Sequence, residues 1–441
     1  MQRLATIWRG RRELGHITGS SAGCAAALFG AAVLGFCFSG AQYALARDTG
    51  AGRLAVSDIT ATQEPGSSVT RIRIRMSRSA QIGIFTLSEP YRLVLDLPQA
   101  DFRLQRDARR PMAGMVLDHR FGLLAPGKSR IILDLSRPFK LVDVRAETDA
   151  LRRSLVQLDV APVPRRAFRP QGVPPRTPRT NVFRSGIFED AAMADRRPKS
   201  RKKRLVVIDP GHGGPDSGAV GHGDVYEKSL VLKVAHKLAR NLRRTGQYRV
   251  ILTRGSDVFV SLADRVEIAQ RVKADLFISL HADAIPQRGF AKRVRGATVY
   301  TLSSRASDIE AAKFAAKENA ADALAGMIVA TGAGGGQIEE ILFDLMRRET
   351  VTFSLKLREH LVRRLARSIS MSRSPRRSAA FKVLRQPGTP SVLIELGYMS
   401  NPADVRQMSK STWQSKAAEA ISVAVSAYFD TRGNSAYTSM R

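Results

Sequence analysis

Cysteine is almost absent from this 441-residue sequence, and both cysteines, Cys24 and Cys37, lie within the first 46 residues. If that leader is removed, the remaining chain can form neither a disulfide nor a thiolate metal site. Acidic residues are also few, because 39 Asp and Glu face 71 Lys and Arg and give a formal net charge of +32. This cationic excess predicts binding to polyanions or acidic surfaces, although composition does not choose between nucleic acid, anionic lipid and cell-wall polymer.

A long apolar run extends from about Ala22 to Phe38, after four arginines and before the small residues Ala44-Leu45-Ala46. This order is typical of an export signal peptide over residues 1–46, with cleavage after Ala46. Glycines interrupt the run, so we favour cleavage over a retained anchor and expect no permanent membrane span afterwards. The pair Arg11-Arg12 leaves the twin-arginine and ordinary export routes open. Removing four Arg and one Glu takes the net charge from +32 to +29.

Strand-like patterns dominate the segment after the leader. Short apolar runs bounded by Pro and Gly, with strict alternation at 71–76, predict a small all-β domain over residues 50–162. Residues 91–97 are echoed by residues 129–135, which favours two similar halves over a coincidence between ordinary strands. Residues 163–204 are rich in Pro and Arg and lack apolar periodicity, so we expect a basic linker there.

From Leu205 the pattern changes to strands that alternate with amphipathic helices. It predicts an α/β catalytic domain over residues 205–430, with a mostly parallel sheet flanked by helices. A helical insertion at about 305–370 is too long for a simple crossover, and residues 431–441 are expected to form a flexible tail. Strands are expected at 205–209, 248–253, 276–280, 297–302, 380–384 and 391–395.

Four side chains that can bind metals or carry protons stand at element ends. His212, His281 and Glu395 each follow a buried-strand pattern, and Glu227 begins an amphipathic helix. Open α/β sheets build their sites at the carboxyl ends of strands, so we expect these side chains to meet. Each alone is more often structural, but their joint placement is hard to obtain by chance. Two imidazoles with one carboxylate are typical of a catalytic zinc site, and a second carboxylate can take a proton from bound water. Spacing does not decide which glutamate binds the metal.

Four ordered motifs then resemble one known family, the zinc-dependent N-acetylmuramoyl-L-alanine amidases of the third amidase type. The resemblance implies that His212, Glu227 and His281 bind zinc and that Glu395 activates the water attacking the amide between muramic acid and L-alanine in peptidoglycan. Arg265 matches a family arginine that supports the site, with a surface salt bridge as the alternative. The motifs are Asp-Pro-Gly-His-Gly-Gly at 209–214, Tyr-Glu-Lys at 226–228, Ser-Leu-His-Ala-Asp at 279–283 and Ile-Glu-Leu-Gly-Tyr-Met-Ser-Asn at 394–401.

Two further segments resemble parts of the same family. The β domain is similar to the AMIN domain, which implies targeting to peptidoglycan at the division septum, in the periplasm. Residues 317–322, Lys-Glu-Asn-Ala-Ala-Asp, resemble the division-amidase branch, in which a helix covers the zinc. The resemblance implies that Glu318 is a fourth zinc ligand in the resting enzyme, with a solvated helical Glu as the alternative. It also implies an activator of the LytM-domain, coiled-coil type that shifts this helix, and a role in daughter-cell separation.

Two other function classes compete with an amidase. A metal-dependent nuclease or phosphoesterase would suit the positive charge, but the basic residues crowd the linker and scattered helix faces without a nucleic-acid-binding motif, so we expect no specific nucleic acid. An export leader also argues against a chromosomal substrate. A non-catalytic wall-binding protein would retain the fold without the ligands, whereas all the candidate site residues are present.

Overall fold

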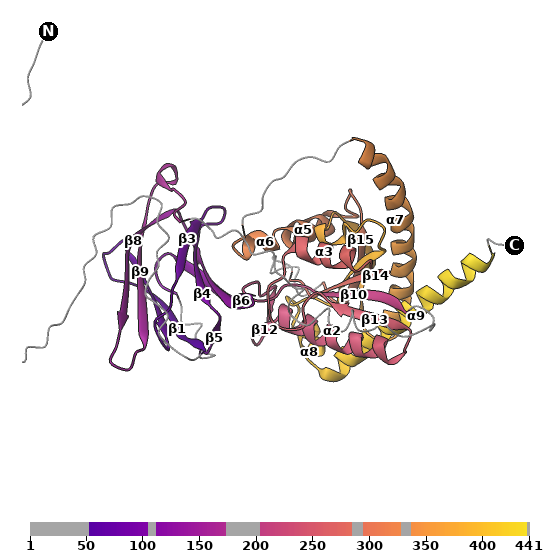
Figure 1. The fold of residues 1–441 in the computed structure, drawn as a ribbon, viewed down its shortest axis with the longest axis horizontal. Helices are drawn as coiled ribbons and strands as arrows, with labels where there is room; N and C mark the ends of the chain where they lie inside the picture. Colours follow the sequence, from indigo (N-terminus) through magenta and orange to yellow (C-terminus); the bar gives the residue numbers. More distant parts are fainter. Residues whose placement is uncertain (1–52, 105–111, 173–202, 285–293, 328–336, 439–441) are drawn as a thin grey trace, which may run out of the picture. The chain divides into compact units, whose positions relative to one another are not determined.

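The computed structural model describes residues 53–104, 112–172, 203–284, 294–327 and 337–438 (Figure 1). The predicted signal peptide, most of the predicted linker and the glycine run at 332–336 lie outside these residues. Among the described residues, no helix is both long enough and apolar enough to cross a membrane.

Residues 54–162 form two antiparallel-rich sheets that enclose a core of their own, which confirms the all-β prediction. The alternation at 71–76 places Ile72, Ile74 and Met76 inside the core and the arginines between them outside. One sheet has the order β5-β1-β2-β9-β8 and the other β3-β4-β7-β6. The strands are β1 (Leu54–Gln63), β2 (Thr70–Met76), β3 (Gly83–Leu87), β4 (Arg92–Pro98), β5 (Ala100–Phe102), β6 (Val116–Ala125), β7 (Lys128–Leu135), β8 (Phe139–Thr148) and β9 (Ser154–Pro162).

The two similar segments at 91–97 and 129–135 become β4 and β7, which pair with each other antiparallel at the centre of their sheet. The register sets Arg92 opposite Asp134 and Asp96 opposite Arg130. The antiparallel pairing is centred on Val94 opposite Ile132, so each arginine of the repeat stands opposite the aspartate of the other segment.

The catalytic domain is built on a six-stranded sheet with the order β13-β10-β14-β17-β15-β16. All neighbouring pairs are parallel except β15 with β17, which confirms the mostly parallel prediction. Its strands are β10 (Arg204–Pro210), β13 (Tyr248–Leu252), β14 (Leu276–His281), β15 (Ala297–Leu302), β16 (Met371–Ala379) and β17 (Ser391–Glu395).

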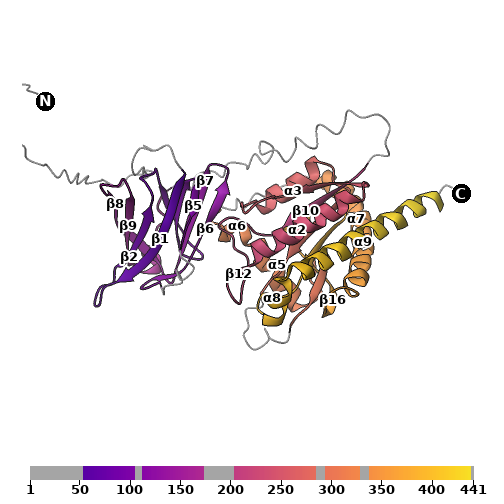
Figure 2. The same ribbon diagram turned by 90° about the horizontal axis from the view of Figure 1, so that it is seen from below.

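Helices cover both faces of this sheet (Figure 2). Alternate residues of each buried strand point to opposite faces, so Val206 and Ile208 join one core and Leu205 and Val207 the other. The first core includes α2 (Glu227–Arg244), α7 (Gln337–Leu365), α8 (Pro402–Met408) and α9 (Ser411–Thr438). The second includes α3 (Leu262–Arg271), α5 (Ile309–Asn319) and the 3-10 helix η4 (Lys382–Leu384). The short α6 (Ala321–Leu324) follows α5 directly.

One strand prediction is wrong. Residues 380–384 do not form a strand, because Val383 and Leu384 are buried by the turn η4. The strand lies just before them, in the polar segment β16 at the edge of the sheet. An edge strand tolerates both its charges and Pro375, so it lacks the apolar pattern by which buried strands are recognised.

Candidate metal centre

The order of three neighbouring strands brings the predicted side chains together. β10, β14 and β17 are adjacent and parallel, so their carboxyl ends share one edge of the sheet. His281 and Glu395 are register partners, and His212 follows β10 by two residues. Glu227 reaches the same edge from the first position of α2. All four side chains are at most 5% exposed.

Three of them form a group that could hold one metal ion, with ligand atoms all within 4.8 Å of one another: His212, Glu227 and His281. Glu227 Oε1 lies 3.0 Å from His212 Nε2 and 3.3 Å from His281 Nδ1. Zn–N bonds of about 2.0–2.1 Å in a tetrahedron place neighbouring ligand atoms about 3.3 Å apart. The separations therefore fit ligands around one zinc-sized cation.

The hydrogen-bond state of the two imidazoles supports the same fit. His212 Nε2 and His281 Nδ1 are buried without a hydrogen-bond partner, even though carboxylate oxygens are close. Buried polar atoms are seldom left unpaired, because the lost hydration is not replaced. A cation between them would satisfy both nitrogens, so these residues suit a metal of the zinc type.

Neighbouring groups hold these side chains in place. Asp216 Oδ2 lies 2.9 Å from His212 Nδ1, which leaves Nε2 to face the metal position. Backbone N–H groups of Ala219 and Ala282 donate to the two oxygens of Glu227, each at 2.8 Å. Sequence reasoning missed Asp216, although its position four residues after His212 in the same turn was a usable signal.

Charge around the site favours a cation. Burial lowers the pKa of His212, but the carboxylates of Asp216, Glu227 and Glu318 outweigh burial and raise the pKa well above its usual value. Burial raises the pKa of Glu227, yet His212 and His281 reverse this and hold the pKa well below its usual value. The same negative field that retains a proton on His212 would attract a divalent ion, so proton and metal compete for this nitrogen.

Glu395 stands beside the group without belonging to it. Its Oε2 accepts a 2.8 Å hydrogen bond from the backbone N–H of Asp283, while Oε1 is buried without a partner. Burial raises the pKa of Glu395 well above the usual value, and the negative charges of Asp283 and Glu227 add to the effect. A fixed carboxylate with one free oxygen and a raised pKa is suited to accept a proton.

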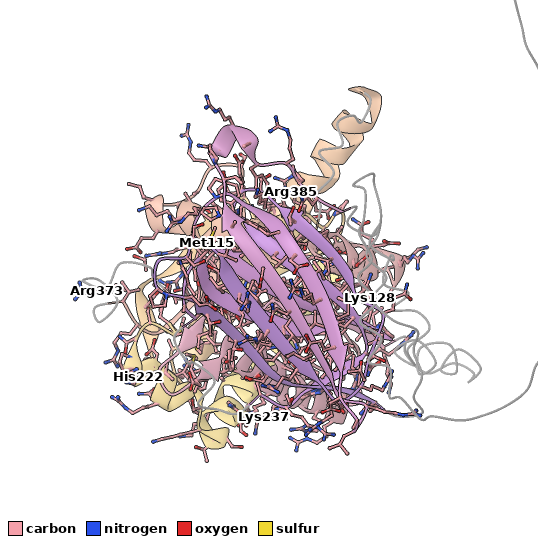
Figure 3. All side chains as sticks on the ribbon, turned by 90° about the vertical axis from the view of Figure 1, so that its left-hand side faces the viewer. Met115, Lys128, His222, Lys237, Arg373 and Arg385 are labelled. Carbon is pink, nitrogen blue, oxygen red and sulfur yellow. The ribbon has the colours of Figure 1, made fainter. Side chains whose placement is uncertain are left out.

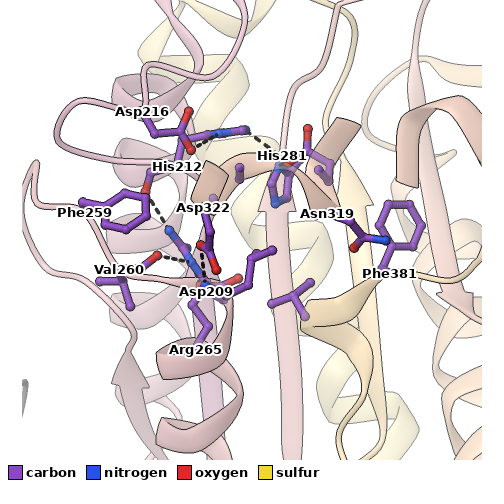
Figure 4. A pocket seen from close by; sticks show the side chains of 15 residues that line it. Asp209, His212, Asp216, Phe259, Val260, Arg265, His281, Asn319, Asp322 and Phe381 are labelled. Atoms are coloured by element: carbon purple, nitrogen blue, oxygen red, sulfur yellow. Dashed lines mark hydrogen bonds and ion pairs between the residues drawn. The ribbon is translucent and has the colours of Figure 1, made fainter. Parts of the chain in front are cut away.

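Arg265 is buried, at 3% exposure, so the surface salt-bridge interpretation is wrong. It donates to Asp209 Oδ1 at 2.6 Å and to the His212 carbonyl at 2.9 Å (Figure 4). It also donates to the Pro210 carbonyl at 2.7 Å. These bonds fix the backbone that carries His212. Arg265 is thus a positioning residue in this structure, and its partner Asp209 was not singled out by sequence reasoning.

The helix α5 closes the site on one side. Glu318 is 5% exposed, and its Oε2 lies 3.5 Å from His212 Nε2 and 3.3 Å from His281 Nδ1. The interpretation of Glu318 as a solvated surface residue is therefore wrong. Glu318, Asn319 and Asp322 of α6 line the pocket that contains both histidines. Figure 4 labels Asn319 and Asp322 beside His212 and His281.

Helices α5 and α6 with the turn to Gly326 are tied to their surroundings, and we call them the inhibitory segment after the role proposed for them below. Lys317 Nζ pairs with the carboxylate of Asp283. Asn319 exchanges hydrogen bonds with the Ala380 carbonyl and the Lys382 N–H, at 2.9 and 2.7 Å. Asp322 accepts from the N–H of Leu262, at the start of α3.

The remaining described histidines lie elsewhere. His222 is exposed and stands at the outer edge of the molecule in Figure 3. His236 Nε2 lies 3.0 Å from the carbonyl of Gly255, whereas His119 belongs to β6 and His360 to α7. Among the described residues, none of these four joins a metal-binding group.

Comparison with known proteins agrees with this geometry. Residues 206–427 match the family described as N-acetylmuramoyl-L-alanine amidase, and residues 58–158 match the AMIN domain. The amidase AmiC of Escherichia coli strain CFT073 is 31% identical over 85% of this chain and 90% of its own length. The amidase AmiA of Escherichia coli K12 is 39% identical over 53% of this chain and 80% of its own length. The solved structure of the amidase AmiC2 of Nostoc punctiforme is 30% identical, covers 52% of this chain and 99% of its own, and has a TM-score of 0.37.

The fold and the polar site define an α/β enzyme domain with a candidate metal centre, preceded by an AMIN domain. The chain belongs to the N-acetylmuramoyl-L-alanine amidase family. It is an amidase of peptidoglycan, which cleaves the bond between N-acetylmuramic acid and L-alanine. The alternative of a nuclease or phosphoesterase is not favoured, because the relatives that match it are amidases.

Proposed function

We propose that the amidase is zinc-dependent and that His212, Glu227 and His281 hold the metal. The observation that carries the proposal is the convergence of their ligand atoms within 4.8 Å, with both imidazole nitrogens buried and unpaired. When bound, zinc lowers the pKa of a coordinated water towards about 7 and polarises a carbonyl oxygen. Asp216 and the N–H groups of Ala219 and Ala282 keep the ligands in place for it.

Glu395 is the proposed general base. Its Oε1 is free to accept a proton from the attacking water, and the Asp283 N–H fixes its other oxygen. The carboxyl can then pass the proton to the leaving nitrogen of L-alanine, so that the amine departs neutral. Burial and neighbouring negative charge raise its pKa, which brings the carboxylate closer to the basicity that this transfer needs.

Glu318 is proposed to inhibit the enzyme at rest. Its carboxylate lies 3.3 and 3.5 Å from the two ligand nitrogens, where it would take the position that water and substrate require. Opening therefore needs a partner that binds the displaced inhibitory segment better than the docked one. A protein of the LytM-domain, coiled-coil type is the proposed activator.

The proposed setting is the periplasm at the division septum, where trimming of peptidoglycan separates daughter cells. The AMIN match and the similarity to AmiC and AmiA support a cell-wall enzyme there. The proposed organisation is a signal peptide over 1–46, an AMIN-like domain over 50–162, a basic linker over 163–204, the catalytic domain over 205–430 and a tail over 431–441, in which residues 431–438 continue α9. The positive charge of the chain suits the anionic polymers of this compartment.

The test uses purified peptidoglycan, the zinc-loaded mature protein and three variants. Glu318→Ala is expected to release intact stem peptides at least about tenfold faster than wild type, because a buried ligand is removed from the metal. Glu395→Ala is expected to release none while still binding zinc. Glu310→Ala is the matched control, since Glu310 lies on the same helix but is exposed and pairs with Arg377 at 2.8 Å.

Mass spectrometry of the products decides between the parts of the proposal. Fragments cut elsewhere than between muramic acid and L-alanine would contradict the reaction. Equal rates for wild type, Glu318→Ala and Glu310→Ala would contradict inhibition by Glu318. A wild-type enzyme with no bound zinc but full activity would contradict the metal assignment.

A further inference from the structure

Three arginines of the AMIN domain donate hydrogen bonds to the end of the inhibitory segment. They come from three adjacent strands of one sheet: Arg92 from β4, Arg120 from β6 and Arg130 from β7. Arg120 donates to the Leu324 carbonyl at 2.9 Å. Arg130 donates to the carbonyls of Ala325 and Gly326 at 3.1 and 2.7 Å, and Arg92 donates to the Ala323 carbonyl.

Carboxylates of the same sheet orient two of these arginines. Arg130 makes a two-pronged pair with Asp96, at 2.6 and 3.0 Å, and Arg120 makes one with Asp134. Arg92 is the register partner of Asp134, but the carboxylate of Asp134 is paired with Arg120. Arg92 instead donates to the Ala323 carbonyl. Arg92 and Arg130 are 3% and 2% exposed, so the N–H groups that they direct at the inhibitory segment are withdrawn from water.

The receiving groups are the carbonyls at and just after the end of α6. The last carbonyls of a helix have no partner within it and carry the negative end of its dipole, although the Ala323 carbonyl also accepts from the Gly326 N–H at 3.0 Å. Residues 323–326 end the segment that begins with α5 and presents Glu318 to the histidines. Arginine is well suited to such a row of carbonyls, since its planar group donates in several fixed directions.

Apolar and backbone contacts continue the same interface towards the metal. Leu124 of β6, Phe259 and Ala325 form a buried cluster. The N–H of Phe259 donates to the Leu123 carbonyl at 3.0 Å, and Phe259 also lines the pocket of His212 and His281. The AMIN domain therefore contacts both the inhibitory segment and the loop beside the metal centre.

We propose that the AMIN domain is a clamp on the inhibitory segment, with Arg92, Arg120 and Arg130 as its gripping residues. This rests on the proposed inhibition by Glu318. Withdrawal of Glu318 together with residues 323–326 would break the hydrogen bonds that Arg92, Arg120 and Arg130 donate to this segment, so the clamp adds to the free-energy cost of opening. By linkage, a ligand that competes for the arginines favours the open enzyme, and an activator that opens the segment alters the affinity of the AMIN domain for that ligand by the same factor.

The experiment compares the mature full-length protein with Arg120→Ala, Arg92→Ala and Arg71→Ala. Arg71 is the matched control, because it makes the same two-pronged pair with Asp159, at 3.0 and 3.0 Å, in the other sheet of the domain. Hydrogen exchange measured by mass spectrometry follows the amides of residues 309–327, and release of stem peptides follows activity. Arg120→Ala and Arg92→Ala are each expected to speed exchange in 309–327 and to raise activity about three- to tenfold, the scale of one lost hydrogen bond. Arg71→Ala is expected to change neither.

A second variant tests the same contact without a substitution in the AMIN domain, in case the arginine variants fail to fold. Ala325→Glu leaves that domain intact and puts a carboxylate into the apolar cluster with Leu124 and Phe259, so it is expected to raise both exchange and activity. If Glu318→Ala activates the enzyme but none of the arginine variants nor Ala325→Glu does, the clamp is wrong and inhibition by Glu318 stands. If Glu318→Ala itself does not activate while exchange in 309–327 still rises in the arginine variants, the clamp stands as a contact and inhibition by Glu318 is wrong.

Discussion

The surroundings of Glu227 and Glu395 shift the pKa values of these two carboxylates in opposite directions, which suits them to different roles. Glu227 accepts two backbone hydrogen bonds and lies beside two imidazoles, which keeps its pKa low and its charge available to a cation. Glu395 accepts only one and lies among like charges, so its pKa is raised and it suits proton transfer. Sequence spacing left these roles open, because it contains no information on burial or hydrogen bonding.

The raised pKa of Glu395 predicts how activity depends on pH. A general base works only when unprotonated, so kcat/KM should fall as the pH falls through that pKa. Asp283 is one of the negative charges that raise the pKa. Asp283→Asn should therefore shift the acidic limb of the kcat/KM profile to lower pH. The profile is measured for zinc-loaded Glu318→Ala enzyme with and without the additional Asp283→Asn substitution. A shift of the acidic limb to higher pH would contradict the prediction.

Among the elements, the turn after β10 and the start of α2 are packed too closely to admit larger residues. Gly218 has φ +64°, and a Cβ there would stand 2.7 Å from both Glu227 Oε2 and His212 Cδ2. A glycine lets the backbone pass directly behind two proposed ligands. The local sequence indicates a turn here, but the close approach comes from α2, which folds back onto it.

Gly218→Ala is expected to weaken zinc binding by about tenfold or more, because both ligands must shift. Gly223→Ala is the matched control, since Gly223 has φ +74° but open space around the added Cβ. Both variants place an alanine in the left-handed backbone region and share that energetic cost. Only the difference between their zinc affinities therefore reports on the ligands. Zinc affinity measured against a competing chelator checks this, and equal affinities would show that the clash is relieved elsewhere.

Element types were predictable where periodicity was strong. The alternating β2 and the amphipathic α2 follow the predicted pattern, and α2 begins at Glu227 as expected. The edge strand β16 escaped prediction because its residues Met371–Ala379 are mostly polar, and its pairing with β15 depends on a partner about seventy residues away in the chain.

At the scale of the whole molecule, the metal is expected to stabilise the fold. A cation that binds only the folded chain adds to its free energy of unfolding, and its removal leaves Glu227, Asp216 and Glu318 buried near one another. Chelation is expected to lower the melting temperature by on the order of 10 °C for a domain of this size. Calorimetry with and without chelator measures this.

His212→Ala supplies the control for that measurement. It removes one proposed ligand, so its melting temperature should respond little to chelator, and returning zinc should restore stability only to the wild-type protein. An equal response of both proteins to chelator would place the stabilising ion elsewhere in the molecule.

The sequence by itself determined the class of fold, the strand ends that carry His212, His281 and Glu395, and the family, because these depend on local periodicity and on short motifs. Only the tertiary structure decided that Asp216 orients His212, that Arg265 braces the loop from inside, and that AMIN-domain arginines grip the end of the inhibitory segment. Each of these is a contact whose geometry or burial is set by packing, and two of the three join residues more than fifty positions apart. Which donor meets which acceptor is fixed by the packing of whole elements, and no local pattern records it.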